Sequence, residues 1–424
     1  MNSRERVHLA LSHREPDRIP LDLGGTPVSS MHASSVYLLR QALKLDPPGT
    51  PVRVVEPTQM LGEIKLDLVE ALGVDVIGTP PSMTMFGFRA ENYKPWVLFD
   101  GTPVLVPGGF NTEPEPSGDV LLYPGGDRTA PPSGRMPKGG YYFDCIIRQP
   151  PIDDDHLDPE DNIEEFGPIS ESDLGFLSEE VGQLYTQTDK AIMLTLFDTG
   201  LGDIALVPAP WLRNPRGIRD VTEWYISLTT RPEYIYEVFS RQCEIALANL
   251  THIHRAVGDQ LTGVLVTGTD FGMQTGPLIS PRTYRELFKP FHKRFNDWIH
   301  THTEWKSFIH SCGSIWAFIP DMIEAGFDIL NPIQTAAAHM EPQALKETFG
   351  HQIAFWGGGV DTQHTLPFAS PDEVRQEVRE RMRTLGRGGG FVFNAIHNIQ
   401  PRVPVENMLA LFEAVEEYRS YPLR

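Results

Sequence analysis

Short apolar runs alternate with longer amphipathic stretches along the second half of the chain. Six of the runs predict buried strands, at residues 191–197, 262–270, 306–312, 328–334, 353–359 and 390–397. The stretches between them carry apolar residues at i, i+3 and i+4, which predicts helices, as at 222–256, 280–302 and 371–386. The last two begin with a serine N-cap followed by proline, at Ser280-Pro281 and Ser370-Pro371. Strands that alternate with helices predict a parallel sheet.

The first 85 residues continue this alternation. Residues 4–14 predict a short helix, 19–25 a strand closed by two glycines, and 59–73 a helix followed by an apolar strand at 74–79. Adding these two strands to the six later ones gives eight strand–helix units. Eight units favour a closed barrel over an open doubly wound sheet, so we expect an α/β protein with a single (β/α)8 TIM barrel.

The stretch from 85 to 165 has a different composition. Of the 40 residues from 101 to 140, 17 are glycine or proline, and short alternating pieces such as PVLVP lie between them. We interpret it as a β-hairpin-rich insertion within the barrel that serves as a lid or as an oligomer contact, for example in a homodimer. The acidic run at 153–166 is interpreted as a solvated face, with a metal site as the alternative.

Charge and composition exclude several kinds of partner. The chain has 36 basic and 56 acidic residues, a net charge of −20, which repels nucleic acid and anionic membranes. The charged start lacks the apolar core of a signal peptide, and no stretch reaches the roughly 18 apolar residues of a membrane span. We therefore expect a cytoplasmic protein. Its three separated cysteines, Cys145, Cys243 and Cys312, do not predict a disulfide framework.

Polar residues end most of the late strands: Asp270, His310 and Cys312, Asn331 and Gln334, Asp361, and His397. Active sites of such barrels lie at the carboxyl ends of the strands, so these residues predict a site. Helix capping is the alternative role for Asp270 and Asp361. Gln274 and Tyr284 are expected to overhang the same mouth. No nucleotide-binding glycine motif, P-loop, nucleophile elbow or H-E-x-x-H helix occurs in the chain.

His310 and Cys312 stand two positions apart in FIHSCGSI and would share one face of a strand. Taken alone, these eight residues favour a buried histidine and a small buried thiol. At a barrel rim the metal alternative gains weight, because zinc accepts imidazole and thiolate and a catalytic zinc keeps three protein ligands. His397, at the end of the last strand, can supply the third ligand.

Five blocks of the chain carry a family resemblance: RERVHLAL…REPDRIP, TDFGMQTGPLISPRTYRELFKPFHKR, HSCGSIWAFIPDMIEAGFDILNPIQ, LKETFGHQIAFWGGGVDTQHTLPFASPDEV and FNAIHNIQPRVPVEN. They resemble the uroporphyrinogen decarboxylase superfamily, whose fold is a single (β/α)8 barrel. The likeness covers residues 190–420 well and 1–85 loosely, and it leaves 85–165 outside.

One branch of this superfamily decarboxylates a tetrapyrrole with many carboxylates, which demands cationic side chains in the cleft. The resemblance implies an arginine-rich segment after the first strand and an aspartate after the second. The corresponding stretches here are LDLGGTPVSSMH, without Arg or Lys, and TPPSM, without a carboxylate. Only His397 fits the late active-site histidine of the decarboxylases.

The other branch consists of corrinoid-dependent methyltransferases, which look like this chain at the H-x-C-G signature, His310 to Gly313. The resemblance implies zinc bound by the histidine, the cysteine and a second cysteine from the last strand, where this chain has His397. That change leaves less negative charge on the metal and makes a stronger Lewis acid. Some relatives have a glutamate after the strand that here contains Asn331 and Gln334, both neutral.

We therefore expect a zinc-dependent methyltransferase that moves a methyl group between a small O-, S- or N-methyl compound or thiol and a corrinoid carried by a partner protein. Zn2+ would be held by His310, Cys312 and His397, with Asp270 and His397 as catalytic residues. The residues expected to bind substrate are Gln274, Tyr284, Asn331, Gln334 and Asp361. Two alternatives stay open: a metal-free carboxy-lyase centred on His397 and Asp270, and a non-catalytic corrinoid- or tetrapyrrole-binding protein.

Overall fold

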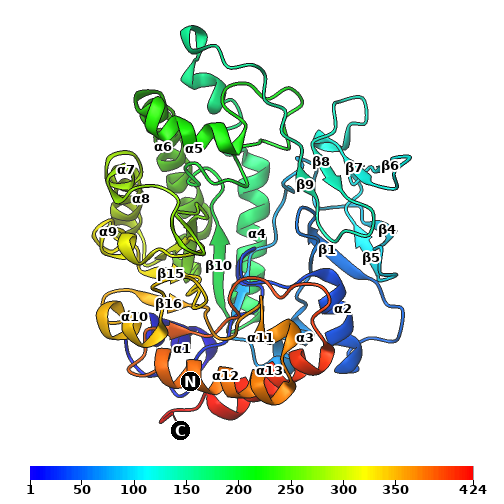
Figure 1. Cartoon of the computed structure of the whole chain (residues 1–424). Helices are drawn as coiled ribbons and strands as arrows, with labels where there is room; N and C mark the ends of the chain where they lie inside the picture. The colour runs from blue at the N-terminus through cyan, green and yellow to red at the C-terminus, as the bar shows by residue number, and fades with distance from the viewer. Residues whose placement is uncertain (424) are drawn as a thin grey trace.

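A curled parallel sheet forms the centre of the computed structural model, which describes residues 1–423 (Figure 1). Seven strands follow one another in the order β17-β16-β15-β14-β11-β10-β3, and every neighbouring pair is parallel. Their bounds in this order are Phe391–Val392, Ala354–Trp356, Ile329–Asn331, Lys306–His310, Gly263–Thr267, Ala191–Thr195 and Val76–Gly78. The six predicted late strands are confirmed, and each ends a few residues earlier than predicted.

The predicted first strand closes this sheet. Leu21 forms a parallel bridge with Phe393 beyond β17, and Asp22 forms one with Val76 in β3. The N–H of Asp22 donates to the carbonyl of Phe393 at 2.8 Å, and the N–H of Asp75 donates to the carbonyl of Leu21 at 2.8 Å. Residues around 21 therefore join the two edges of the sheet, as expected for a TIM barrel.

Apolar side chains fill the barrel interior. Alternate strand positions supply them because successive side chains point to opposite faces, and the buried set includes Val76, Met193, Leu265, Phe308, Ile329 and Trp356. The Phe308 and Trp356 rings meet edge to face at 5.4 Å. Trp356 also donates its Nε1–H to Asp22 Oδ2 at 2.7 Å, and burial raises the pKa of this carboxyl to about 6. The filled interior leaves the strand ends as the place for chemistry.

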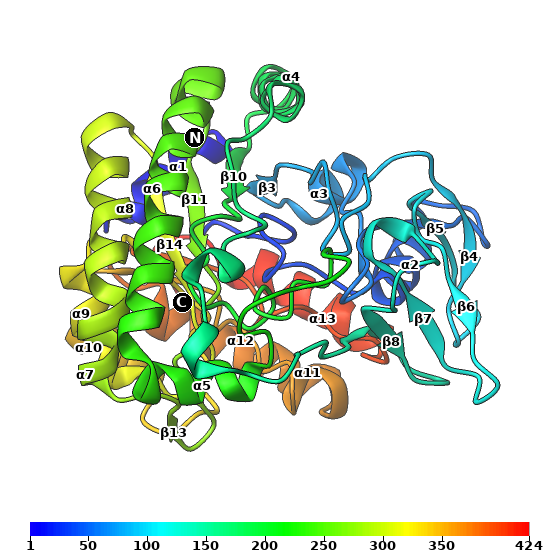
Figure 2. The same ribbon diagram turned by 90° about the horizontal axis from the view of Figure 1, so that it is seen from above.

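Helices surround the sheet (Figures 1 and 2). They include α1 Ser3–Leu11, α2 Ala33–Ala42, α3 Leu66–Leu72, α4 Glu171–Gln187, α5 Val221–Thr230, α6 Pro232–Val257, α8 Lys289–His302, α9 Ile319–Glu324, α10 Pro342–Phe349, α12 Pro371–Leu385 and α13 Val405–Tyr418. The predicted helix at 222–256 is divided at Arg231, because Pro232 cannot donate a backbone hydrogen bond. Both serine N-caps are confirmed. No helix within residues 1–423 is long and apolar enough to cross a membrane.

Two small sheets lie to one side of the barrel in both views (Figures 1 and 2). One has the order β2-β1-β5-β4, with bounds Leu61–Gly62, Val52–Glu56, Pro103–Val106 and Lys94–Val97. The other is antiparallel, with β6 Glu113–Pro114, β7 Val120–Leu122, β8 Gly134–Met136 and β9 Asp144–Cys145. The strands of the second sheet fall within residues 85–165, whose function as a lid or oligomer contact stays a prediction.

The acidic run at 153–166 is more than a solvated face. Glu165 accepts an ion pair from Arg219 at 2.7 Å, and both side chains are buried, at 4% and 1% exposure. Asp161 pairs with Arg216 at 2.7 Å. Arginines beyond β10 therefore hold the second half of this run, whereas the acidic residues of its first half are exposed, as expected for a solvated face: Asp153, Asp154, Asp155, Asp158 and Glu160.

Candidate metal centre

Three side chains converge beyond the carboxyl ends of the strands. His310 ends β14, Cys312 follows two residues later, and His397 lies beyond β17; one ligand atom of each lies within 4.8 Å of the others. The Sγ of Cys312 lies 3.4 Å from Nε2 of His310. With bonds of about 2.3 Å to sulfur and about 2.0 Å to nitrogen, a tetrahedral zinc separates such atoms by about 3.5 Å. The donor set and this spacing fit zinc.

A neighbouring strand prepares His310 to bind a metal. The Nδ2 of Asn331 donates to the carbonyl of Trp356 at 2.8 Å, which leaves its Oδ1 to accept from Nδ1 of His310 at 2.6 Å. The imidazole proton therefore sits on Nδ1, and the Nε2 lone pair faces Cys312. Asn331 was expected to bind substrate, but its amide is already used by His310 and Trp356.

The backbone around Cys312 is held from two sides. Its N–H donates to Asp270 Oδ1 at 2.6 Å, and the N–H of Gly313 donates to Gln334 Oε1 at 2.7 Å. Gly313 has φ of 85°, and a Cβ there would lie 2.5 Å from the backbone carbon of Gly272. Only glycine fits this position, which explains the residue after the cysteine. Asp270 and Gln334 thus hold the thiol-bearing loop.

His397 is held differently from His310. It lies in a loop with φ of 68°, a left-handed conformation that few residues other than glycine adopt. The N–H of Asn398 donates to its Nδ1 at 2.8 Å, so the neutral ring carries its proton on Nε2. The rings of His310 and His397 stand 5.1 Å apart, nearly perpendicular. His397 must therefore move its proton or rotate before Nε2 can bind a metal.

Burial keeps the imidazoles of His310 and His397 and the thiol of Cys312 uncharged. Burial lowers the pKa of His310 to about 4 and that of His397 to about 3. Burial also raises the pKa of the Cys312 thiol well above its usual value, and the carboxylates of Asp270 and Asp203 raise it further. Within residues 1–423, no lysine or arginine contributes to these shifts or to that of Asp270. Two neutral imidazoles and a thiol are a donor set that suits a zinc ion.

Two further groups of this site were not found from the sequence. Asp203, in the loop after β10, accepts the N–H of Ala205 at 2.9 Å; burial, with the Asp270 charge, raises its pKa to about 6. Tyr225, in α5, donates its hydroxyl to the backbone carbonyl of Asp270 at 2.9 Å. The rule that polar residues end strands, extended to the strand at 191–197, selects Asp198, whose carboxylate accepts from Asn249 at 2.7 Å, and it misses Asp203 in the loop beyond. Tyr225 lies in a helix, and the sequence around it contains no signal that would assign it to the site.

Three of the expected substrate-binding residues have other contacts. Asp361 Oδ1 accepts the N–H groups of Gln363 at 2.6 Å and His364 at 3.0 Å in the turn before the short helix α11 Thr365–Phe368, whose N-cap is His364; Asp361 therefore holds this turn and does not cap the helix. Gln274 is exposed and donates to the side chain of Gln363 at 3.1 Å. Tyr284 does not overhang the mouth: it is fully buried, and its hydroxyl contacts His292 at 3.1 Å. A short π-helix, Tyr284–Phe288, turns this ring into the aromatic core.

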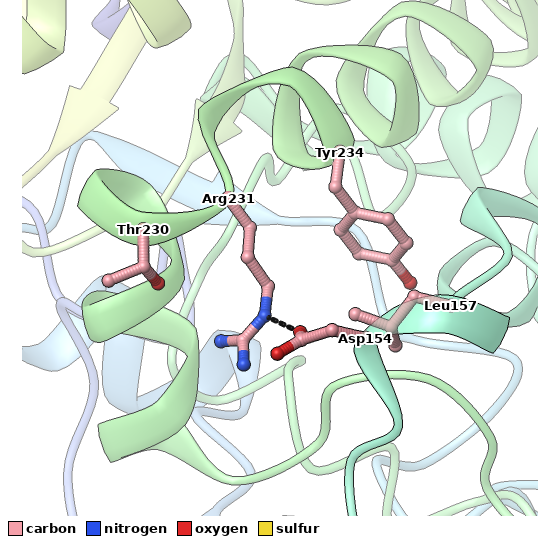
Figure 3. Close-up of a pocket in the computed structure, with 5 residues that line it drawn as sticks. All are labelled: Asp154, Leu157, Thr230, Arg231 and Tyr234. Atoms are coloured by element: carbon pink, nitrogen blue, oxygen red, sulfur yellow. Dashed lines mark hydrogen bonds and ion pairs between the residues drawn. The ribbon is translucent and has the colours of Figure 1, made fainter.

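A hollow of about 380 Å³ lies elsewhere, beside the junction of α5 and α6 (Figure 3). Its lining residues are Asp154, Leu157, Thr230, Arg231 and Tyr234, none of which belongs to the metal triad. Arg231 donates to Asp154 across it at 2.5 Å. The two charges facing the hollow are therefore paired with each other.

The comparisons with known proteins agree with this architecture. Residues 215–418 match the family model of uroporphyrinogen decarboxylase (URO-D), and the metal triad lies within the matched residues. Among solved structures, a methyltransferase from Methanosarcina mazei superimposes with a TM-score of 0.55 at 14% identity, covering 98% of this chain and 99% of that one. At this identity the likeness shows the fold alone.

The similar curated proteins align over part of their length. A uroporphyrinogen decarboxylase of Actinobacillus succinogenes is 40% identical over 73 residues, which are 17% of this chain and 20% of that protein. One from Hydrogenovibrio crunogenus is 25% identical over 181 residues, 40% of this chain and 49% of that protein. The matches thus span half or less of these relatives, and their activity enters only as a proposal.

Proposed function

We propose that this chain is a methyltransferase that moves a methyl group from a small methylated compound to the corrinoid of a separate protein. The observation that carries the proposal is the convergence of the Cys312 sulfur with the imidazoles of His310 and His397 within 4.8 Å. The fold shared with a methyltransferase from Methanosarcina mazei supports it. A cytoplasmic location, a corrinoid protein as partner and a homodimer through residues 85–165 belong to the same proposal.

Zinc held by His310, Cys312 and His397 would supply Lewis acidity to the heteroatom that carries the methyl group. The chain itself orients these ligands. Asn331 keeps the His310 proton on Nδ1, away from Cys312. Asp270 and Gln334 hold the backbone on either side of the sulfur through the N–H groups of Cys312 and Gly313. These hydrogen bonds from Asn331, Asp270 and Gln334 fix the positions of the ligands before substrate binds.

The buried carboxyls favour a methyl group on oxygen. The corrinoid would accept the methyl group, the electron pair of the broken C–O bond would stay on oxygen, and that oxygen would need a proton. Asp203 would supply that proton at pH values near or below its pKa, which burial and the neighbouring Asp270 raise to about 6. A sulfonium or quaternary ammonium substrate would leave as a neutral molecule and would need no proton. We therefore place alcohols and methyl ethers first among substrates.

Decarboxylation of a tetrapyrrole is the second candidate, because the curated relatives are named uroporphyrinogen decarboxylase. A substrate with many carboxylates needs several cationic partners. The stretch after the first strand, LDLGGTPVSSMH, contains no Arg or Lys. The neutral metal-ligand set therefore favours methyl transfer.

Metal analysis and a methyl-transfer assay test the proposal together. Protein purified without added metal should contain about one zinc per chain, and Cys312→Ser should lose it while Cys145→Ser keeps it. The wild-type protein should then convert cob(I)alamin to methylcobalamin with a methoxyaromatic donor, followed by absorbance. Absence of zinc in the wild-type protein, together with CO2 release from a tetrapyrrole polycarboxylate, would establish the lyase instead.

A further inference from the structure

The small antiparallel sheet at the side of the barrel contacts the loop that follows the last strand. Tyr141 and Tyr142 lie between β8 and β9. The hydroxyl of Tyr142 donates to Oε1 of Gln400, and Nε of Arg402 donates to the hydroxyl of Tyr141 at 3.2 Å. The backbone carbonyl of Tyr141 also contacts Nε2 of His32 at 3.2 Å, beside the start of α2. Two successive tyrosines therefore join this sheet to two loops of the barrel.

A continuous set of hydrogen bonds runs from Gln400 to His397. Gln400 donates its Nε2 to the carbonyl of Asn398 at 3.1 Å, and the N–H of Asn398 donates to Nδ1 of His397 at 2.8 Å. The Asn398 side chain is anchored as well, accepting from Ser30 at 2.6 Å and donating to Pro27 at 2.9 Å. Asn398 is 1% exposed, so these bonds are shielded from water.

Two residues of this loop need such support. His397 has φ of 68° and Arg402 has φ of 66°, and neither is glycine. Residues in the left-handed region persist where their surroundings hold them there. The barrel holds the loop backbone at Ile399, whose N–H donates to the carbonyl of Ser30 at 3.0 Å, and at Gln400, whose carbonyl accepts from Ser35 Oγ at 2.7 Å. The inserted sheet adds the contacts to the side chains of Gln400 and Arg402.

We propose that Tyr142 is a positioning residue for His397, so that the inserted sheet, once docked, delivers the third metal ligand through Gln400 and Asn398. This gives residues 85–165 a part in the site, although they supply none of its ligands. The inference rests on the proposed function where it concerns zinc, and on the hydrogen bonds alone where it concerns the position of His397.

Tyr142→Phe tests this, with Tyr93→Phe as the matched control. Tyr93 lies before β4 in the same region, and its ring packs under Arg53 at 4.7 Å, away from the 397–402 loop. In the metal-free protein, diethylpyrocarbonate modification of individual histidines is followed by mass spectrometry. Tyr142→Phe should raise the reactivity of His397 several-fold and leave His310 unchanged. Zinc affinity, measured against a chromophoric chelator, should fall roughly three- to tenfold.

A second variant tests whether Tyr142 acts on His397 through Gln400. Gln400→Met should reproduce both changes, and the double variant with Tyr142→Phe should be no worse than Gln400→Met alone, since both remove one connection. Equal His397 reactivity in Tyr142→Phe and Tyr93→Phe would overturn the proposal. If the wild-type chain binds no zinc, the proposed metal function fails, while the modification experiment still decides whether Tyr142 positions His397.

Discussion

The two histidines of the candidate metal centre belong to regions that are built differently. His310 is the last residue of β14 and pairs in register with Asn331 of β15, which accepts its ring proton. His397 lies five residues beyond the end of β17, in a left-handed conformation, and accepts a hydrogen bond at Nδ1. One ligand is thus oriented by strand pairing, and the other by loop contacts. His310 is therefore already oriented to bind a metal, whereas the orientation of His397 depends on the contacts of its loop.

Replacing each histidine gives the largest test of this comparison. His310→Ala should lower zinc affinity by at least about 100-fold, because loss of an outer partner alone costs about 10- to 100-fold. His397→Ala should lower it by roughly 10- to 100-fold, which is less than His310→Ala, since the His397 ring must first give up the Asn398 hydrogen bond. Competition with a chromophoric chelator measures both. Equal losses in the two variants would show that the two ligands are equally prepared.

Acid unfolding of the metal-free protein sharpens the same comparison. Burial lowers the pKa of His397 to about 3 in the folded chain, against about 6.5 for an unfolded histidine. The unfolded state binds more protons between these values. The stabilisation from the neutral ring is therefore complete above pH 6.5 and is lost as the pH falls toward 3, at up to about 1.4 kcal/mol per pH unit.

His397→Gln removes this titration. In urea unfolding with a chelator at several pH values between 6.5 and 4, wild-type stability should fall relative to that of His397→Gln. Gln274→Ala, which changes an exposed side chain, should follow the wild-type protein throughout. Parallel pH profiles for the wild-type protein and His397→Gln would contradict burial of a neutral His397.

The smallest expected effect concerns the partner of the prepared histidine. Asn331→Ala removes the acceptor of the His310 proton, so the ring is free to change tautomer, and zinc affinity should fall by about tenfold. The same substitution leaves the carbonyl of Trp356 without its donor, so the free energy of unfolding should fall by about 1 kcal/mol. Chelator competition and urea unfolding separate the two effects. Unchanged zinc affinity would show that Asn331 does not orient His310.

The sequence identified several residues of the site correctly but assigned some of them the wrong role. Asn331 and Gln334 were found because they end a strand, but they hold His310 and Gly313 instead of facing substrate. In a parallel sheet, a polar residue at one strand end lies beside its neighbour's end, which local spacing does not show. Tyr284 was misplaced for a related reason: the residues after a loop can turn toward the core, as the π-helix does here.

By itself, the sequence determined the alternation of buried strands and amphipathic helices, and therefore the barrel. It also predicted that His310 and Cys312 lie together, and their side chains do meet at 3.4 Å, although β14 ends at His310 and Cys312 stands in the loop beyond it. Only the tertiary structure decided that His397 meets them from a loop 85 residues later, that Asp203 and Tyr225 approach the same mouth, and that the inserted sheet contacts the His397 loop. These contacts join residues far apart in the sequence. They depend on closure of the barrel and on long-range packing, which the periodicity of a single helix or strand does not predict.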